Sequence, residues 1–169
     1  MSRAKLRTDH FVFPAYDVPR TLRFYTEILG FPLSGAFSGD DWGGRPWLMM
    51  LFDVGDGRQI VLCALQGAGQ PRADGLPADV RHYAFAVWST RELGSWKRRL
   101  RAAKVKVSTE DHGDQQSIYF ADPNGVMLEI TAPPSAKALV RDPGANATVR
   151  QWLELYPKRR SRRRRRGFR

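Results

Sequence analysis

The chain has 169 residues, of which 42% are hydrophobic and 27% charged, a composition that excludes a wholly disordered protein. The formal net charge is +11, but nine of the 28 basic residues lie in residues 158–169, where no acidic residue occurs. The rest of the chain has 19 basic and 17 acidic residues and is therefore nearly neutral. The net charge does not by itself indicate a nucleic-acid-binding domain.

Cysteine content and hydropathy exclude further classes of protein. Cys63 is the only cysteine, which rules out an intrachain disulfide and four-cysteine zinc sites. No apolar run approaches the roughly 20 residues of a membrane span, and no apolar segment follows the basic residues 1–8 as in a signal peptide. We expect a cytoplasmic protein that has no membrane span.

The first elements are a strand followed by a helix. Residues 10–16 resemble a β-strand, and Asp17 is a suitable N-cap for a helix that ends at Gly30. Apolar residues recur at helical spacing between these two positions. Residues 31–34, 47–52 and 59–65 resemble further strands, the last two joined by the turn residues Asp56 and Gly57.

The same order of elements recurs about 70 residues later. Residues 82–88 resemble a strand, and residues 89–92 form a capping box at the start of a second amphipathic helix. Strand-like segments follow at residues 105–108, 117–120 and 126–131, with turn residues at 122–125. We therefore predict an α+β protein with two βαβββ modules, residues 8–66 and 81–133, joined by a linker at residues 67–80.

Strand parity places three potential metal ligands opposite the bulky apolar faces of their strands. His10 and His82 open the first strand of each module, and Glu129 lies in the last strand of the second. Two imidazoles and one carboxylate can hold Fe(II), Mn(II) or a similar divalent ion with open coordination positions. For each residue alone, a partly exposed polar side chain remains an alternative, because periodicity does not show that the three meet.

Residues 9–31, 82–87 and 117–131 resemble the vicinal oxygen chelate superfamily, which includes glyoxalase I, bleomycin-resistance proteins, fosfomycin-resistance enzymes and type I extradiol dioxygenases. The resemblance implies a cupped, mixed eight-stranded sheet around a divalent metal, with His10, His82 and Glu129 as its ligands. Fe(II) or Mn(II) is favoured, with Zn, Ni or Co as alternatives. The resemblance also implies that the protein acts on a small-molecule substrate and forms a homodimer.

Departures from the family pattern distinguish between activities. When the two modules are aligned, Val61 of the first occupies the position of Glu129 in the second. Glyoxalase I has a glutamate there as a fourth metal ligand, and that ligand is absent from this sequence. Three intact ligands favour an enzyme over a metal-free resistance protein. The spacing of His112, Tyr119 and Glu129 resembles that of extradiol dioxygenases, although Glu110 departs from their pattern. We expect a dioxygenase-like enzyme acting on a small aromatic or vicinal-oxygen substrate, with a metal-dependent lyase or thiol transferase and a metal-free binding protein as alternatives.

Four residues are candidates for catalysis or substrate binding. His112 is suited to acid–base chemistry near neutral pH, and Tyr119 to hydrogen-bond donation to the substrate. His112 could equally be an ordinary loop histidine, and Tyr119 a packed strand aromatic. Trp42 and Trp47 flank a glycine-rich loop and offer flat surfaces to a substrate, although Trp47 could instead be a core residue.

The C-terminal residues differ in composition from the two modules. Residues 134–157 form an extension with a short amphipathic helix near residues 148–155. Residues 158–169 are an Arg-rich run that we expect to be disordered. This run can bind polyanions non-specifically, but no groove-reading motif accompanies it, so we expect no specific nucleic-acid partner.

Overall fold

The computed structural model describes residues 8–55, 57–134 and 143–156. Residues 1–137 form one compact unit and residues 138–169 a second. The tail expected at residues 158–169 lies outside the described residues. No helix in the described ranges is long and apolar enough to cross a membrane.

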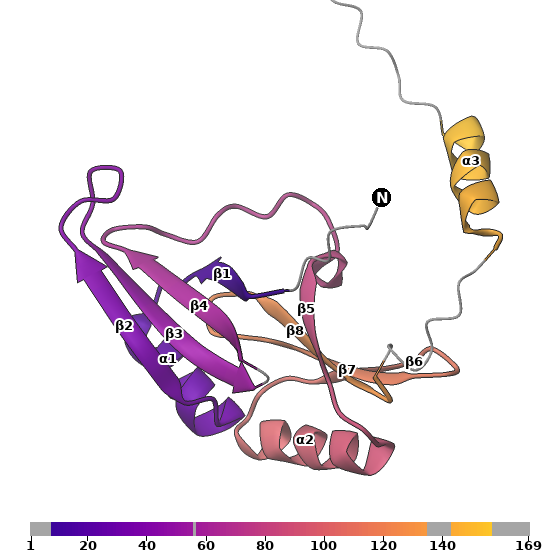
Figure 1. Cartoon of the computed structure of the whole chain (residues 1–169), viewed down its shortest axis with the longest axis horizontal. Helices are drawn as coiled ribbons and strands as arrows, with labels where there is room; N and C mark the ends of the chain where they lie inside the picture. The colour runs from indigo at the N-terminus through magenta and orange to yellow at the C-terminus, as the bar shows by residue number, and fades with distance from the viewer. Residues whose placement is uncertain (1–7, 56, 135–142, 157–169) are drawn as a thin grey trace, which may run out of the picture. The chain divides into compact units, whose positions relative to one another are not determined.

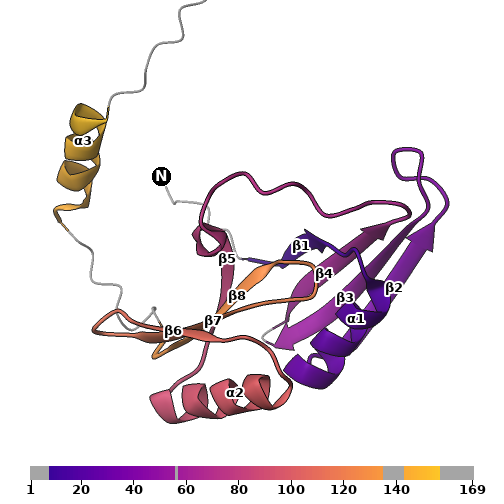
Figure 2. The same cartoon turned by 180° about the vertical axis from the view of Figure 1, so that it is seen from behind.

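Each half of the first unit contains one four-stranded mixed sheet (Figures 1 and 2). The first contains β1 (His10–Pro14), β2 (Leu33–Gly39), β3 (Trp47–Gly55) and β4 (Arg58–Leu65) in the order β1-β4-β3-β2. The second contains β5 (His82–Ala86), β6 (Ser108–Asp111), β7 (Gln116–Ala121) and β8 (Met127–Ala132) in the order β5-β8-β7-β6. In both sheets the first and last strands pair in parallel. The α+β class and the paired βαβββ modules are therefore confirmed.

The two long helical segments begin where the sequence indicates. Asp17 caps α1 (Val18–Arg23) by accepting a hydrogen bond from the Arg20 amide. The helix continues as η1 (Phe24–Leu29), a π-helical segment that ends at Gly30 in a left-handed conformation. Ser89 caps α2 (Thr90–Ala102) through the Glu92 amide. A short 3₁₀ helix, η2 (Ala78–Val80), precedes β5.

One predicted strand is displaced along the chain. We predicted a strand at residues 105–108, but the strand of the structure, β6, begins only at Ser108. It extends to Asp111 and so includes charged residues that lie after the predicted strand. Lys104 has a positive φ of 61°, and the Val105 amide bonds the Leu100 carbonyl, so the chain turns back to close α2. Val105 and Val107 then pack against the core. Charged residues are tolerated in β6 because it is an edge strand.

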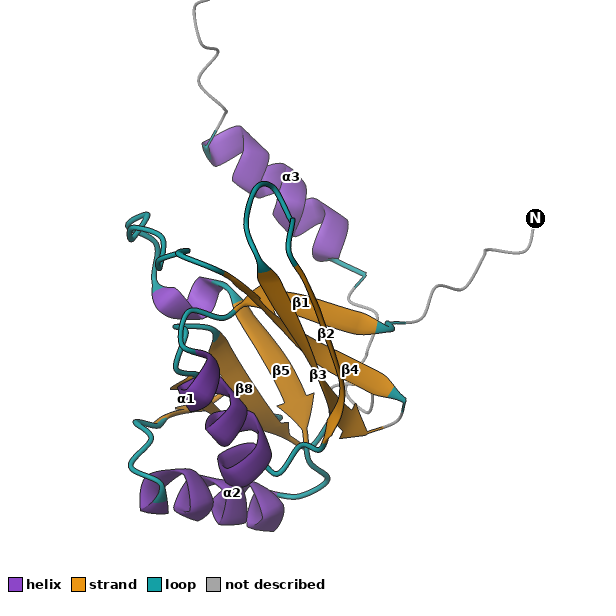
Figure 3. Cartoon of the chain, turned by 90° about the vertical axis from the view of Figure 1, so that its left-hand side faces the viewer, coloured by secondary structure: helices purple, strands orange, loops and turns teal. Residues whose placement is uncertain are grey.

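A single hydrophobic core joins the two modules. Helices α1 and α2 lie next to each other on one side of the sheets (Figure 3). Buried residues from both halves, including Tyr25, Phe52, Leu100 and Phe120, belong to one cluster. The ring centroids of Phe11 in β1 and Tyr83 in β5 are 4.4 Å apart. Because each module covers apolar surface of the other, residues 1–137 behave as one unit.

Buried polar contacts connect the turn after β7 to the first module. Asn124 accepts a hydrogen bond from the Tyr16 amide at 2.8 Å and donates one to the Thr21 hydroxyl at 2.9 Å. The Tyr25 hydroxyl donates to the Asp122 carboxylate at 3.1 Å. Burial raises the pKa of Asp122 above its ordinary value. These contacts fix the turn between β7 and β8 against α1 and η1.

We predict that Asn124→Ala lowers the free energy of unfolding by about 1–3 kcal/mol, because it removes the acceptor of the half-buried Tyr16 amide and one of the partners of the buried Thr21 hydroxyl. Urea unfolding of the full chain would measure this. Tyr25→Phe is the milder comparison, since it deletes one hydrogen bond and should cost about 1 kcal/mol. An Asn124→Ala variant as stable as the parent would show that the contacts do not hold the modules together.

Candidate metal and catalytic site

One face of the second sheet carries a group of polar side chains beside small residues. Ala84, Glu129 and Tyr119 lie in register across β5, β8 and β7. Paired residues point to the same side of a sheet, and His82 shares this side because it lies two residues before Ala84. The alanines on β5 leave space above the sheet. The parity expected from the sequence therefore places His82 and Glu129 on a common face.

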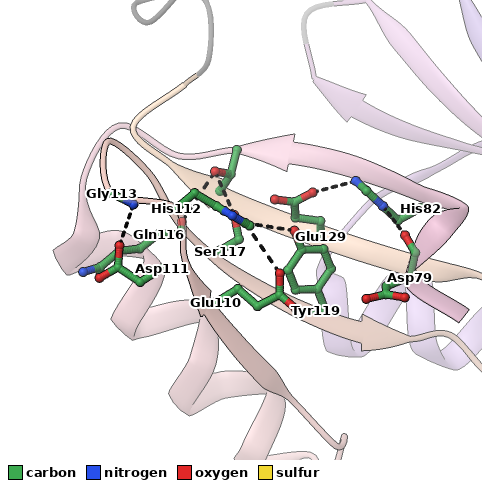
Figure 4. Close-up of polar contacts among 11 residues, drawn as sticks. Asp79, His82, Glu110, Asp111, His112, Gly113, Gln116, Ser117, Tyr119 and Glu129 are labelled. Carbon is green, nitrogen blue, oxygen red and sulfur yellow. Dashed lines mark hydrogen bonds and ion pairs between the residues drawn. The ribbon is translucent and has the colours of Figure 1, made fainter. Parts of the chain in front are cut away.

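His82 and Glu129 are in direct contact (Figure 4). The His82 Nε2 atom lies 2.9 Å from a Glu129 carboxylate oxygen, and its Nδ1 atom lies 2.6 Å from the Asp79 carbonyl oxygen. A carbonyl oxygen only accepts hydrogen bonds, so Nδ1 must carry the proton that it donates to Asp79. In neutral His82 the Nε2 lone pair then faces the carboxylate, and two acceptors this close require a proton or a cation near both.

This donor set fits a divalent metal ion. Metal-binding histidines commonly donate their second ring N–H to a backbone carbonyl, which fixes the tautomer. Ligand atoms about 2.1 Å from one ion and at right angles to each other lie about 3 Å apart, close to the observed separation. The Glu129 side chain is only 9% exposed and that of His82 is 34% exposed, so the pair borders solvent on the imidazole side.

Tyr119 and His112 extend this polar group along the sheet (Figure 4). The His112 Nε2 atom lies 3.3 Å from the Tyr119 hydroxyl and 3.7 Å from a Glu110 carboxylate oxygen. Burial, together with the charge and hydrogen bond of Glu129, raises the pKa of Tyr119 above its ordinary value. The phenol therefore keeps its proton near neutral pH and can donate it in a hydrogen bond.

A shallow cavity of about 400 Å³, largely open to solvent, lies beside these residues. It is lined by Pro77, Asp79, Val80, His82, Glu110 and Tyr119. This space is sufficient for a small substrate next to the His82–Glu129 pair. His112 contacts Tyr119 at the edge of this group and its side chain is 46% exposed.

His10 lies apart from the other two expected ligands. Its ring contacts Asp9 at 2.7 Å and is 51% exposed. Among the described residues, no three His, Cys, Asp or Glu side chains are close enough to hold one ion. The strand registers pair Val12 with Val61 and Ala84 with Glu129, so His10 and His82 occupy equivalent positions and Val61 replaces the carboxylate. Among its described residues, one chain thus brings together two of the three expected ligands.

Trp42 and Trp47 contact each other, and Trp47 lines a pocket other than the one beside His82. Their ring centroids are 5.7 Å apart in an edge-to-face arrangement. The Trp47 indole packs so close to Gly39 that a Cβ atom there would come within 2.7 Å of it. Trp47 borders a cavity of about 500 Å³ at the end of the first sheet, together with Tyr16 and Gln66. Within one chain, neither tryptophan lines the cavity beside His82.

Two contributors to the site are absent from the sequence-based expectations. The Asp79 carbonyl orients His82, and no side-chain pattern could reveal a backbone acceptor. Glu110 lines the cavity and contacts His112. Glu110 lies in β6 and His112 directly follows the last residue of that strand, Asp111.

Comparisons with known proteins show the family of the chain. The sequence profile of the Glyoxalase/Bleomycin resistance protein/Dioxygenase superfamily matches residues 7–130. The chain belongs to this superfamily. Over 124 residues it is 26% identical to glutathione transferase FosA of Serratia marcescens, which covers 72% of the chain and 77% of that protein.

Two solved structures of similar proteins share the superfamily fold. Trypanothione-dependent glyoxalase I of Leishmania major has a TM-score of 0.60 and 19% identity, over 89% of this chain and 99% of that one. A point mutant of FosX, a fosfomycin resistance protein of Listeria monocytogenes, has a TM-score of 0.56 and 20% identity, over 82% and 99% of the chains. That FosX structure holds Mn(II) and 1S,2S-dihydroxypropylphosphonic acid.

We predict that His82→Ala and Glu129→Gln each weaken Mn(II) binding at least about 100-fold, because loss of a ligand costs more than loss of the groups that orient it. Isothermal titration of the full chain with Mn(II) would measure this. His112→Ala is the matched control, since it removes a neighbouring imidazole that contacts neither ligand. Full Mn(II) affinity in both ligand variants would show that the ion is held elsewhere.

Proposed function

We propose that this member of the superfamily is a divalent-metal-dependent, dioxygenase-like enzyme acting on a small aromatic substrate with two vicinal oxygens. The observation that supports the proposal most directly is the continuous polar group from His82 and Glu129 through Tyr119 to His112. It combines two metal ligands with a phenol and an imidazole that can exchange protons with a substrate.

His82 and Glu129 are the residues that hold the metal in this proposal. When bound, Fe(II) or Mn(II) supplies a Lewis acid with open positions for the substrate and O₂. The Asp79 carbonyl keeps the Nε2 lone pair of His82 directed at the site. The low exposure of Glu129 keeps water away from the carboxylate and strengthens its interaction with a cation.

In this proposal Tyr119 donates a hydrogen bond to the substrate, and His112 transfers protons. Tyr119 retains its own proton near neutral pH and donates a hydrogen bond to a substrate oxygen in the cavity. The imidazole of His112 is half exposed and lies within reach of the Tyr119 hydroxyl, so it can pass a proton between solvent and the phenol. Glu110 lies beside the same Nε2 atom and also lines the cavity.

A homodimer would supply the third ligand. A catalytic metal site usually has three protein ligands, and one chain brings together two among its described residues. His10 lies on a face of the first sheet where Val12 and Phe37 are 49% and 59% exposed. If this face covers the polar face of a second copy, the partner subunit's His10 reaches His82 and Glu129. Trp42 and Trp47 would contact the substrate from the same face.

Mixing two inactive variants tests this arrangement. His10→Ala and Glu129→Gln each damage every site of their own homodimers. A heterodimer of the two has one site with both changes and one with neither, so an equal mixture should regain about a quarter of the wild-type activity. No recovery after subunit exchange, verified by exchange of labelled subunits, would contradict a site shared between copies.

The similarity to a glutathione transferase favours a second candidate function. Glutathione transferase FosA is the relative that matches 72% of this chain. A metal held by His82 and Glu129 could equally polarise a small oxygen-bearing electrophile for attack by a thiol. In that reaction Tyr119 would donate a hydrogen bond to the oxygen on which negative charge develops.

We predict that Fe(II)-loaded protein consumes oxygen with a panel of catechols, and that His112→Gln lowers kcat about 10²–10⁴-fold without loss of metal. Asp114→Asn, in the same loop, is the matched control and should retain full activity. The oxygen electrode and metal analysis provide the two measurements.

Three other outcomes would contradict the proposed dioxygenase-like activity. Glutathione consumption with fosfomycin and Mn(II), without oxygen uptake, would assign the protein to the transferases. Isomerisation of a glutathione adduct would assign it to the lyases. Ligand binding without metal and without turnover would make it a binding protein.

A further inference from the structure

The C-terminal helix α3 (Ala145–Leu155) has one strongly apolar face. Val149, Trp152 and Tyr156 follow at spacings of three and four residues and therefore share one side of the helix. Their exposed fractions are 59%, 62% and 61%. Leu153 and Leu155, also about 60% exposed, flank this stripe. Arg150, Gln151 and Glu154 occupy the opposite side.

The aromatic residues of this face form a compact group. The ring centroids of Trp152 and Tyr156 are 4.4 Å apart. Continuous exposed apolar surface is unfavourable in water and marks a site of interaction. Tryptophan and tyrosine are the residues that concentrate at the interface between lipid headgroups and acyl chains, because each has an apolar ring and a polar atom.

The residues after α3 supply a strong positive charge. Residues 158–169 contain nine Lys or Arg and no Asp or Glu. This run begins at residue 158, three residues after the helix ends in the sequence. Basic clusters beside an amphipathic helix are attracted to anionic phospholipids, and each residue near such a surface strengthens binding about fivefold.

We propose that α3 and residues 158–169 together bind the surface of a membrane that contains anionic phospholipids. The apolar face enters the interface, and the basic run contacts the headgroups. An 11-residue helix is about 16 Å long, too short to span the hydrocarbon core, so it lies in the plane of the surface. A nucleic acid would neutralise the same charge but would leave the apolar face uncovered, and for this reason a lipid surface is the better match.

Vesicle flotation with the full chain tests the proposal. We expect binding to vesicles of phosphatidylcholine and phosphatidylglycerol, and at least about tenfold weaker binding to pure phosphatidylcholine. Val149→Gln combined with Trp152→Gln should weaken binding to the mixed vesicles at least about tenfold, because it removes the inserted surface. Changing residues 162–166 from Arg to Gln should weaken it by a similar factor or more. Gln151→Asn, on the polar side of α3, is the matched control and should bind like the parent.

Several outcomes would overturn the proposal. Equal binding by the parent and the Val149→Gln, Trp152→Gln variant would show that the basic run acts alone, as in a general polyanion contact. No binding to mixed vesicles, with a change in oligomeric state of that variant in sedimentation experiments, would show that α3 packs on a second copy. Tight, α3-independent binding to duplex DNA or RNA without vesicle binding would identify a nucleic acid as the partner. Urea unfolding of residues 1–137 within the full chain should be unchanged in every variant.

Discussion

The buried contacts of Asp122 and Asn124 determine how the two modules fit together. Both side chains belong to the turn between β7 and β8, and they bind Tyr16, Thr21 and Tyr25 of the first module. The turn also joins the strands that carry Tyr119 and Glu129. A buried carboxylate and amide are tolerated only when their hydrogen bonds are satisfied, and these bonds cross between the modules or close the turn. The position of the site therefore depends on the contact between modules.

The two modules share a fold but differ in what their open faces present. In the second module this face carries His82, Glu129 and Tyr119, with alanines that leave room for a ligand. In the first, the equivalent face carries Val12 and Val61, with His10 as its ligand-type residue at the edge. The face of the second module therefore carries polar side chains, and the equivalent face of the first module is mainly apolar. This division is the physical basis for proposing that two copies complete each other's sites.

The second unit of the chain has a different character from the first. Its helix exposes the aromatic and aliphatic residues that a globular domain would bury, and a concentrated positive charge follows it. Neither property is needed for the folding of residues 1–137, which have their own core. The association that we infer for this unit would place residues 1–137 near a membrane surface.

The sequence by itself determined the repeated βαβββ order, the helix caps at Asp17 and Ser89, and the shared face of His82 and Glu129. These features follow from local rules, namely capping, turn formation and the alternation of side chains along a strand. The start of β6 was misplaced because the backbone at Lys104 closes α2 and packs Val105 on the core, a tertiary effect. The tertiary structure alone decided that the Asp79 carbonyl orients His82, that Glu110 faces His112, and that His10 lies apart from the pair. The first two contacts join residues two or three positions apart, and they depend on a local backbone conformation that the alternation of side chains does not specify. The position of His10 depends on how two segments distant in sequence approach one another, and no periodicity along the chain contains that information.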